Sequence, residues 1–301
     1  MSATGVTRCG YVALVGAPNA GKSTLLNQLI GAKVSIVSPK VQTTRSRVLG
    51  IVIEGSAQLV FIDTPGIFQP KRRLERAMVA AAWAGTEDAD VVVVLTDASR
   101  GGDGDTQRIV DGLKAAGRGA LLALNKVDLV SPPQLLPLAE RWTKAGIFDA
   151  VFMVSALTGD GVGDLRKHLA AALPAGPWLY PEDQLTDLPQ RLLAAETTRE
   201  QIFLQLHQEL PYATMVETDT WEERPDGSVK IAQTVHVQRD SQKAIVLGKG
   251  GRQIKEIGAK ARGELERVLG RRVHLFLFVR VTAGWTEDRE RYTAMGLDFE
   301  S

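Results

Sequence analysis

The sequence has a single cysteine, little excess charge and no long apolar run. Cys9 alone cannot form an internal disulfide, which excludes a disulfide-rich secreted scaffold. The 36 basic and 35 acidic residues nearly cancel, so the overall charge indicates neither nucleic acid nor a membrane as a partner. No apolar run approaches the roughly 20 residues that span a bilayer, and the N-terminal residues carry no secretory segment. We therefore expect a cytoplasmic protein whose partners are recognised by local features.

Short apolar runs alternate with helical stretches over the first half of the sequence. This alternation is typical of an α/β domain, in which crossover helices cover both faces of a mainly parallel sheet. The predicted strands are 12–15, 59–63, 91–95, 121–124 and 151–154. Four prolines between 174 and 189 then predict a stiff, extended connection. We therefore predict an α/β domain at 9–174, a linker at 175–189 and a smaller domain at 190–301.

The second half follows a different pattern. A helix containing Phe203, Leu206 and Leu210 is expected first, followed by strands at 214–222 and 229–237 that are joined through a Pro-Asp-Gly turn. A helix with an apolar face at 254–268 and an alternating strand at 273–281 come next. This order of elements predicts an α+β domain.

A glycine-rich segment follows the first predicted strand and precedes a helical stretch. Backbone N–H groups of such a loop, together with the N-terminus of the next helix, bind phosphate oxygens. Lys22 can place a cation on the β and γ phosphates, and the Ser23 hydroxyl can bind Mg²⁺. A chance glycine-rich turn is the alternative, which the further motifs disfavour. The predicted loop comprises Gly16, Ala17, Pro18, Asn19, Ala20, Gly21, Lys22 and Ser23.

Three further motifs end later strands of the same domain, at the edge where α/β sheets bind ligands. In the first, Asp63 can hold Mg²⁺ through water and the N–H of Gly66 can contact the γ-phosphate. In the second, the Asp128 carboxylate matches two adjacent donors of guanine, a pair that adenine lacks. In the third, backbone N–H groups can close the base pocket. The remaining predicted nucleotide-binding residues are Thr64, Pro65, Ile67, Asn125, Lys126, Val127, Ser155, Ala156 and Leu157.

These motifs resemble the G1, G3, G4 and G5 boxes of translation-factor-like GTPases, and residues 42–45 resemble their G2 box. The resemblance implies Mg²⁺-dependent GTP hydrolysis in which Lys22, Thr44 and Gly66 act at the phosphates. It also implies that a G2 threonine binds Mg²⁺ in the GTP state, along with Ser23 and Asp63. Thr44 is favoured for this role, although the sequence does not choose between it and Thr43. An exposed polar loop is the alternative for this segment.

Isoleucine occupies the position where Ras-like enzymes place a water-orienting glutamine. Ile67 can neither donate nor accept a hydrogen bond, so we expect slow intrinsic hydrolysis that another element stimulates. One candidate is a partner that orders the loop of Thr43 and Thr44. The other is K⁺, because Asn19 matches the asparagine with which related GTPases bind this ion. A simple turn-forming residue is the alternative for Asn19.

The second domain carries a Gly-x-x-Gly segment between an apolar stretch and an amphipathic helix. It resembles the loop of KH domains, whose backbone clamps the sugar-phosphate chain of a single strand, and the predicted order of elements is that of the type II KH fold. From 239 to 280, eleven Lys or Arg stand against four Asp or Glu, which suits phosphate binding. A solvated helix face is the alternative. The predicted RNA-binding residues are Gly248, Lys249, Gly250, Gly251, Arg252 and Lys255.

The GTPase boxes and the KH-like domain together resemble the Era family of bacterial GTPases over nearly the whole sequence. The resemblance implies binding of GTP, GDP and the 3′ region of small-subunit ribosomal RNA, with a role in assembly of the 30S subunit. Some members associate peripherally with the inner membrane, and a monomer is expected here. The alternatives are a signalling switch that binds protein effectors, which RNA affinity that falls steeply with salt would disfavour, and an ATP-driven enzyme, which competition between GTP and ATP would test.

Overall fold

The computed structural model describes residues 6–45, 47–101, 104–206 and 210–301. Its contacts divide the chain into two compact units. Unit 1 comprises Met1–Ser35, Thr44–Asp187 and Tyr292–Ser301, and unit 2 comprises Ile36–Thr43 and Leu188–Arg291. The units differ from the predicted domain ranges at 36–43, which belongs to unit 2, and at 292–301, which belongs to unit 1. Residues 175–187 of the predicted linker also fall in unit 1.

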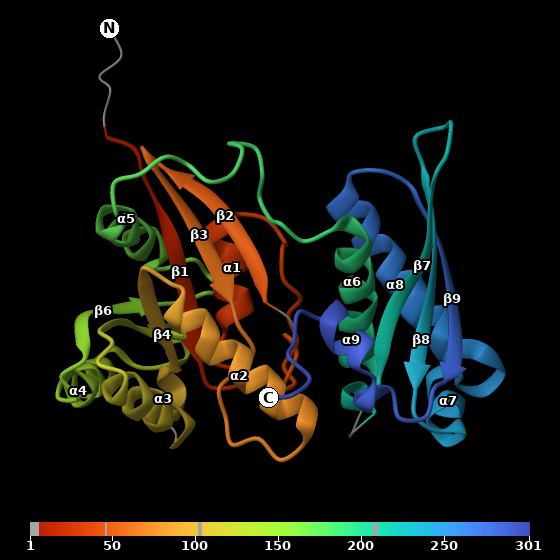
Figure 1. Ribbon diagram of the computed structural model, residues 1–301, viewed down its shortest axis with the longest axis horizontal. Helices are drawn as coiled ribbons and strands as arrows, with labels where there is room; N and C mark the ends of the chain where they lie inside the picture. The colour runs from red at the N-terminus through yellow and green to blue at the C-terminus, as the bar shows by residue number, and fades with distance from the viewer. Residues whose placement is uncertain (1–5, 46, 102–103, 207–209) are drawn as a thin grey trace, which may run out of the picture. The chain divides into compact units, whose positions relative to one another are not determined.

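Unit 1 is built on a six-stranded sheet in the order β2-β3-β1-β4-β5-β6 (Figure 1). The antiparallel pair is β2 with β3, and the other neighbours are parallel. The strands are β1 (Arg8–Gly16), β2 (Val48–Glu54), β3 (Ala57–Asp63), β4 (Val91–Asp97), β5 (Ala120–Asn125) and β6 (Phe148–Val154). The carboxyl ends of the five parallel strands consequently share one edge of the sheet, as the predicted α/β architecture requires.

Helices cover both faces of this sheet. Apolar side chains of α2, α3 and α4 pack with β1, β4 and β5 in one core, and α1 and α5 contact β2 and β3. Alternate strand residues such as Val15, Val94 and Leu122 point into the first core and are fully buried. The helices are α1 (Lys22–Ile30), α2 (Arg73–Glu87), α3 (Gly104–Ala115), α4 (Pro132–Thr143) and α5 (Val162–Ala172).

The predicted proline-rich linker lies along the β2–β3 side of unit 1. The fully buried Gln58 of β3 donates from Nε2 to the Tyr180 carbonyl at 2.8 Å, and its Oε1 accepts from the backbone N–H of Leu179 at 2.8 Å. Farther along, the Thr186 hydroxyl donates to the Leu49 carbonyl of β2 at 2.6 Å. These bonds attach the segment to the sheet at two points.

Unit 2 is a three-stranded sheet in the order β7-β8-β9, with β7 antiparallel and β9 parallel to the central strand. Apolar residues of α6, α7 and α8 pack against one face of it. The elements are α6 (Gln190–Gln205), β7 (Met215–Glu223), β8 (Val229–Val237), α7 (Asp240–Leu247), α8 (Arg252–Leu269) and β9 (Val273–Val281). The predicted α+β order is confirmed. The helix expected to contain Leu206 and Leu210 is shorter, because α6 ends at Gln205.

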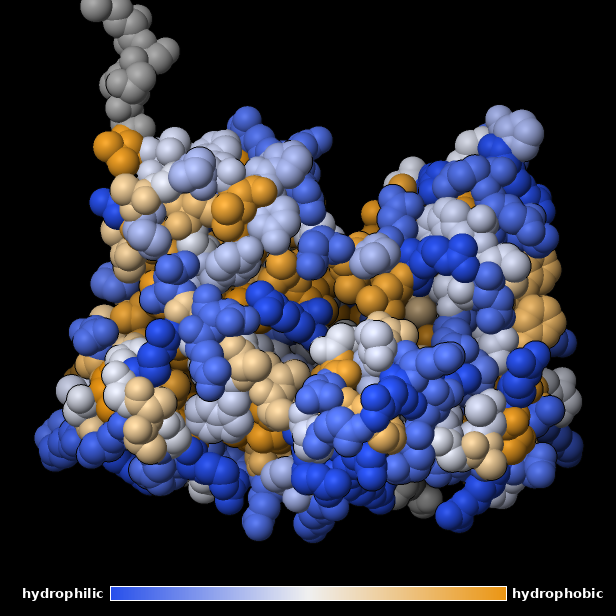
Figure 2. Space-filling view, viewed as in Figure 1, coloured by the Kyte–Doolittle hydropathy of each residue, from blue (hydrophilic) through white to orange (hydrophobic). Residues whose placement is uncertain are grey.

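A short helix, α9 (Arg289–Ala294), follows β9. Hydrophilic residues cover most of the visible surface of each unit (Figure 2). Among the described residues, no helix combines the length and the apolar character needed to cross a membrane.

Candidate functional sites

The predicted phosphate-binding loop connects β1 to α1, and its path depends on glycine. Asn19 and Gly21 have φ values of 63° and 99°, in the left-handed region. A Cβ atom at Gly16 would lie 2.5 Å from the Leu95 carbonyl oxygen, and one at Gly21 would lie 2.3 Å from Asn125 Nδ2. Glycine at these two positions therefore allows the loop to pass against the ends of β4 and β5.

Lys22, the first residue of α1, is only 7 % exposed. Its ammonium donates to the carbonyl oxygens of Gly16 at 3.1 Å and Ala17 at 3.2 Å. Burial lowers the pKa of Lys22 to about 8, and the nearby Asp63 carboxylate opposes this shift. A buried cation with neutral carbonyl partners gains stability from an anion, so this position suits a phosphate.

Side-chain oxygens gather at the carboxyl end of β3. Asp63 Oδ2 accepts hydrogen bonds from the hydroxyls of Ser23 at 2.7 Å and Ser35 at 2.9 Å. Burial raises the pKa of the Asp63 carboxyl, while Lys22 and the hydroxyl donors lower it in part. Its Oδ1 is buried without a hydrogen-bond partner in the described part of the chain. A carboxylate oxygen left in this state beside hydroxyl oxygens fits a hard divalent cation such as Mg²⁺.

The two adjacent threonines of the G2 segment have different partners. The Thr44 hydroxyl lies 2.8 Å from Ser23 Oγ and 3.4 Å from Asp63 Oδ2. The Thr43 hydroxyl instead donates to the Lys40 carbonyl at 2.8 Å. Thr44 is therefore the threonine that the structure brings to Ser23 and Asp63. Ser35 joins the same group of oxygens and was not predicted.

The segment after Asp63 passes close to the phosphate-binding loop. A Cβ atom at Gly66 would lie 3.0 Å from the Pro18 nitrogen, and the Ile67 N–H donates to the Gly16 carbonyl at 3.1 Å. The side chain of Ile67 is fully buried in the core formed with α2, α3 and α4. Ile67 thus offers its backbone to the loop, while its side chain serves packing.

Asn125 links the predicted base-binding segments to the phosphate-binding loop. Its Nδ2 donates to the Ala20 carbonyl at 2.7 Å, and its Oδ1 accepts from the Ala156 N–H at 2.9 Å. Asp128 follows on an exposed turn, where its carboxylate is accessible to a base. The structure therefore brings the predicted loops after β1, β5 and β6 together. The side chain of Leu157 is directed to solvent and is 78 % exposed, which leaves its backbone as the part that can contact a base.

Asp97, at the end of β4, is a site residue that the sequence did not reveal. Its Oδ2 lies 2.6 Å from the Lys126 ammonium. Burial works to raise the pKa of Asp97, but the hydrogen bonds from Lys126 and Ser99 hold it below its usual value. The ion pair fixes the lysine of the Asn-Lys-x-Asp motif beside the predicted base site. The predicted strand stopped at Leu95, so a carboxylate at a strand end was the available signal.

The Gly-x-x-Gly segment forms a tight turn between α7 and α8. A Cβ atom at Gly248 would lie 2.7 Å from Gln253 Cβ, and Gly251 caps α8 with a φ of 76°. The side chains of Lys249, Arg252 and Lys255 are exposed. The turn therefore presents basic side chains around the N-terminus of an 18-residue helix, an arrangement that can bind phosphates.

Comparisons with known proteins agree with this division of the chain. The sequence model of a family described as a 50S ribosome-binding GTPase matches residues 11–126, and the model of the KH domain matches residues 209–286. GTPase Era of Rhizobium meliloti is 59 % identical over 293 residues, which cover 97 % of this chain and 94 % of the relative. GTPase Era of Brucella suis is 57 % identical over 97 % of this chain and 94 % of its own.

Two solved structures of Era superpose with a TM-score of 0.91 at 40 % identity, covering 96 % of this chain and 99 % of theirs. One is an Aquifex aeolicus variant bound to GDP and aluminium tetrafluoride. The other is Era in complex with MgGDPNP and nucleotides 1506–1542 of 16S ribosomal RNA. The predicted P-loop GTPase and KH folds are confirmed, and this chain belongs to the Era family of GTPases.

Proposed function

We propose that this GTPase binds the 3′ region of small-subunit ribosomal RNA and that its GTP state controls this binding during assembly of the 30S subunit. One observation carries the proposal. The same chain holds the group of loops that suits a guanine nucleotide and an exposed, basic Gly-x-x-Gly turn. The Era complex with MgGDPNP and 16S ribosomal RNA, 40 % identical to this chain, supports the same pair of ligands here.

The phosphates of GTP would occupy the loop between β1 and α1. The backbone N–H groups there donate to phosphate oxygens, and the buried ammonium of Lys22 balances their charge. Ser23, Thr44 and Asp63 would hold Mg²⁺, which neutralises charge that develops on the β and γ oxygens during hydrolysis. The N–H of Gly66 would report the presence of the γ-phosphate. Because the Ile67 side chain is buried in the core, it cannot orient the attacking water.

The base would lie between the loops that follow β5 and β6. The two oxygens of Asp128 can accept from the two adjacent N–H donors of guanine, and the backbone at Leu157 can face the guanine carbonyl. Adenine lacks this donor pair, so ATP would leave the carboxylate unsatisfied. The geometry therefore favours GTP over ATP.

The turn of unit 2 would clamp RNA. Exposed backbone at Gly250 allows the sugar-phosphate chain to approach, and Lys249 and Arg252 neutralise phosphate charge. Binding through phosphates releases counterions, so the affinity should fall steeply as salt is added. RNA affinity with this salt dependence would disfavour a signalling switch whose second unit binds a protein effector.

The experiment that tests the proposal measures binding of a single-stranded RNA from the 3′ end of small-subunit ribosomal RNA. The protein is loaded with a non-hydrolysable GTP analogue or with GDP. We expect tighter binding in the GTP state, and we expect Gly251→Asp to weaken binding about tenfold or more, because it places a negative charge at the turn that should contact phosphates. Fluorescence anisotropy at two salt concentrations gives both the affinity and its salt dependence.

Gly227→Asp is the matched control. Gly227 also lies in unit 2, has a φ of 78° and has no atom within 4 Å of an added Cβ, but it belongs to the turn between β7 and β8. The Gly227→Asp variant should bind RNA with the affinity of the unchanged protein. Equal affinities for Gly251→Asp and Gly227→Asp, or no RNA binding in either nucleotide state, would contradict the proposed clamp and favour a protein partner.

We also propose that K⁺ stimulates hydrolysis through Asn19. A monovalent cation beside the phosphates can stabilise charge that an arginine supplies in other GTPases. Hydrolysis should be roughly tenfold faster in KCl than in NaCl of equal concentration, measured as phosphate release. Asn19→Gly retains access to the φ of 63° while removing the amide, so it should abolish the difference. Equal rates of the unchanged protein in both salts would refute this role.

We also propose that the protein acts in the cytoplasm as a monomer and that it can associate peripherally with the inner membrane. The single cysteine and the absence, in the described residues, of a helix that could cross a bilayer are compatible with this location. The exposed side chains of Lys249, Arg252 and Lys255 at the Gly-x-x-Gly turn offer a means of attraction to anionic lipid.

A further inference from the structure

The segment 36–43 belongs to unit 2 because α6 binds it at several points. Near its start, the N–H of Val37 donates to Glu200 Oε1 at 2.8 Å. In its middle, the Lys40 ammonium donates to the carbonyls of Phe203 and Leu206. The Phe203 carbonyl lies in the last turn of α6 and the Leu206 carbonyl directly follows the helix, where carbonyls lack intrahelical partners and attract a cation. The segment is thus attached to α6 through both backbone and side-chain groups.

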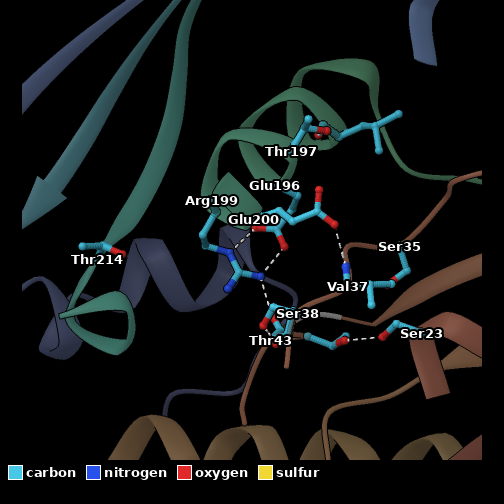
Figure 3. A network of polar contacts seen from close by, with 12 residues as sticks. Ser23, Ser35, Val37, Ser38, Thr43, Glu196, Thr197, Arg199, Glu200 and Thr214 are labelled. Atoms are coloured by element: carbon cyan, nitrogen blue, oxygen red, sulfur yellow. Dashed lines mark hydrogen bonds and ion pairs between the residues drawn. The ribbon is translucent and has the colours of Figure 1, made fainter. Parts of the chain in front are cut away.

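Arg199 forms the attachment nearest to the G2 threonines. Its Nη2 donates to the Thr43 carbonyl at 2.5 Å, while its Nε donates to Glu196 Oε1 at 2.7 Å (Figure 3). The second Glu196 oxygen accepts from the same Nη2, and the guanidinium also lies over the Phe203 ring at 5.1 Å from its centroid. Arg199 is only 2 % exposed, so this cation is held in a fixed position inside the unit.

Stability alone does not explain a cation at this position. Nη1 of Arg199 is buried and has no hydrogen-bond partner in the described part of the chain. A buried donor without a partner costs free energy, and a buried charge costs more. An apolar residue could fill this space without that cost, but it would lack the polar contacts with Glu196 and the Thr43 carbonyl. Glu196 lies on α6 itself, so the Thr43 carbonyl is the partner through which the guanidinium acts outside its own helix.

The Thr43 carbonyl belongs to the same planar peptide group as the N–H of Thr44. A hydrogen bond that holds this carbonyl also holds the peptide plane, and it therefore restricts the direction in which the Cα–Cβ bond of Thr44 points. The Thr44 hydroxyl lies 2.8 Å from Ser23 Oγ, in the group of oxygens that suits Mg²⁺. At the other end of the segment, the hydroxyl of Ser35 donates to Asp63 Oδ2 at 2.9 Å. Both flanks of the segment consequently contact the same carboxylate group.

We propose that Arg199 is a positioning residue for GTP hydrolysis, which acts by holding the Thr43–Thr44 peptide so that the Thr44 hydroxyl stays beside Ser23 and Asp63. The role concerns hydrolysis itself and does not depend on RNA binding. The contact with Arg199 also couples α6 to the metal site, because a displacement of α6 would move the Thr43 carbonyl. The same coupling acts in reverse when the metal site changes state.

The test compares Arg199→Ala with Arg191→Ala. Arg191 is also on α6 and also donates to backbone carbonyls, those of Thr218 and Asp219, but these lie on β7. Arg199→Ala should lower kcat for GTP about tenfold, the effect of losing one charge-assisted hydrogen bond, and should raise the Mg²⁺ concentration needed for half-maximal hydrolysis. Its affinity for GDP should stay unchanged, because the G2 threonine contacts the metal only in the GTP state. Arg191→Ala should match the unchanged protein in all three measurements.

Two further variants guard against a simple folding defect. Arg199→Lys keeps the charge and one donor group, and should recover part of the lost kcat. Lys40→Met keeps the length of the side chain but removes the donor to the α6 carbonyls, so it should shift the Mg²⁺ requirement in the same direction. The proposal is wrong if Arg199→Ala is folded by circular dichroism and binds GDP normally, yet hydrolyses GTP with the same kcat and Mg²⁺ requirement as Arg191→Ala. If Arg199→Ala does not fold, Arg199→Lys and Lys40→Met provide the test instead. An unchanged kcat and an unchanged Mg²⁺ requirement in both of these variants would overturn the proposal.

Discussion

Asp128→Asn should lower the affinity for GTP about 10³-fold and create affinity for xanthosine triphosphate. The Asp128 carboxylate offers two acceptors, which match the N1–H and the amino group of guanine. Asparagine offers one acceptor and one donor, so its amide would face the amino group of guanine donor to donor. Xanthine carries a carbonyl oxygen in place of that amino group and therefore pairs with the asparagine. The change converts a matched pair into a mismatched one for GTP alone.

Competition of unlabelled nucleotides against a fluorescent GTP analogue measures these affinities and so tests the prediction. The analogue binds the unchanged protein, and a xanthine analogue replaces it for the variant. Asp111→Asn is the control, because Asp111 is exposed on α3 and accepts a hydrogen bond from Gln107 at 2.9 Å. It should leave both affinities unaltered. If Asp128→Asn kept its preference for GTP, Asp128 would lie outside the base pocket.

Lys22→Met should lower kcat for GTP hydrolysis by about 10²- to 10³-fold. Methionine has a similar length and can occupy the buried position, where Lys22 is 7 % exposed, but it carries no charge. The β and γ phosphates would then lose the cation that stabilises their developing charge. Single-turnover hydrolysis with saturating Mg²⁺ separates this chemical effect from weaker binding.

The pH dependence of GTP binding supplies an independent check on Lys22. Because burial lowers its pKa to about 8 in the free protein, Lys22 is charged below pH 8 and loses its proton as the pH rises through 8. Phosphates favour the charged form, so binding above pH 8 requires uptake of a proton, and the affinity should fall up to about tenfold per pH unit. Lys22→Met should show no such decline between pH 7 and 9. A decline of equal size in the variant would assign it to another group.

Residues that are close in the sequence were the easiest to predict. The loop from Gly16 to Ser23 contains its own glycines, lysine and hydroxyl, and its position between a strand and a helix follows from local pattern. The placement of Asp63 and Asn125 also follows, because parallel strands bring their carboxyl ends to one edge. The local sequence thus specified the fold class and most of the groups that gather at that edge.

Contacts between distant segments could not be predicted in this way. Asp97 pairs with Lys126 and Arg199 with Thr43 across 29 and 156 positions of the chain. No characteristic sequence spacing marks either pair, because tertiary packing alone brings the two partners together. The strand β2 is not among the predicted strands. Gly50 interrupts its apolar run, and a Cβ there would lie 2.6 Å from Leu26 Cδ1, so packing of α1 accounts for the glycine.

The adjacent threonines show a third limit of local pattern. Thr43 and Thr44 have the same side chain, and only the path of the backbone decides which hydroxyl meets Ser23. That path depends on α6, whose residues come more than a hundred positions later in the sequence. Information from the second half of the chain therefore determines a detail of the nucleotide site in the first half.

The assignment of residues 292–301 to unit 1 has a consequence for biosynthesis. Tyr292 and Leu297 are buried in an apolar cluster with Ala77 and Met78 of α2. A ribosome makes the chain from its N-terminus, so the strands and helices of unit 1 emerge well before this cluster can close. Until Leu297 leaves the ribosome, Ala77 and Met78 lack the partners that complete this cluster. The apolar cluster on α2 of unit 1 is therefore completed only after all of unit 2 has been synthesised.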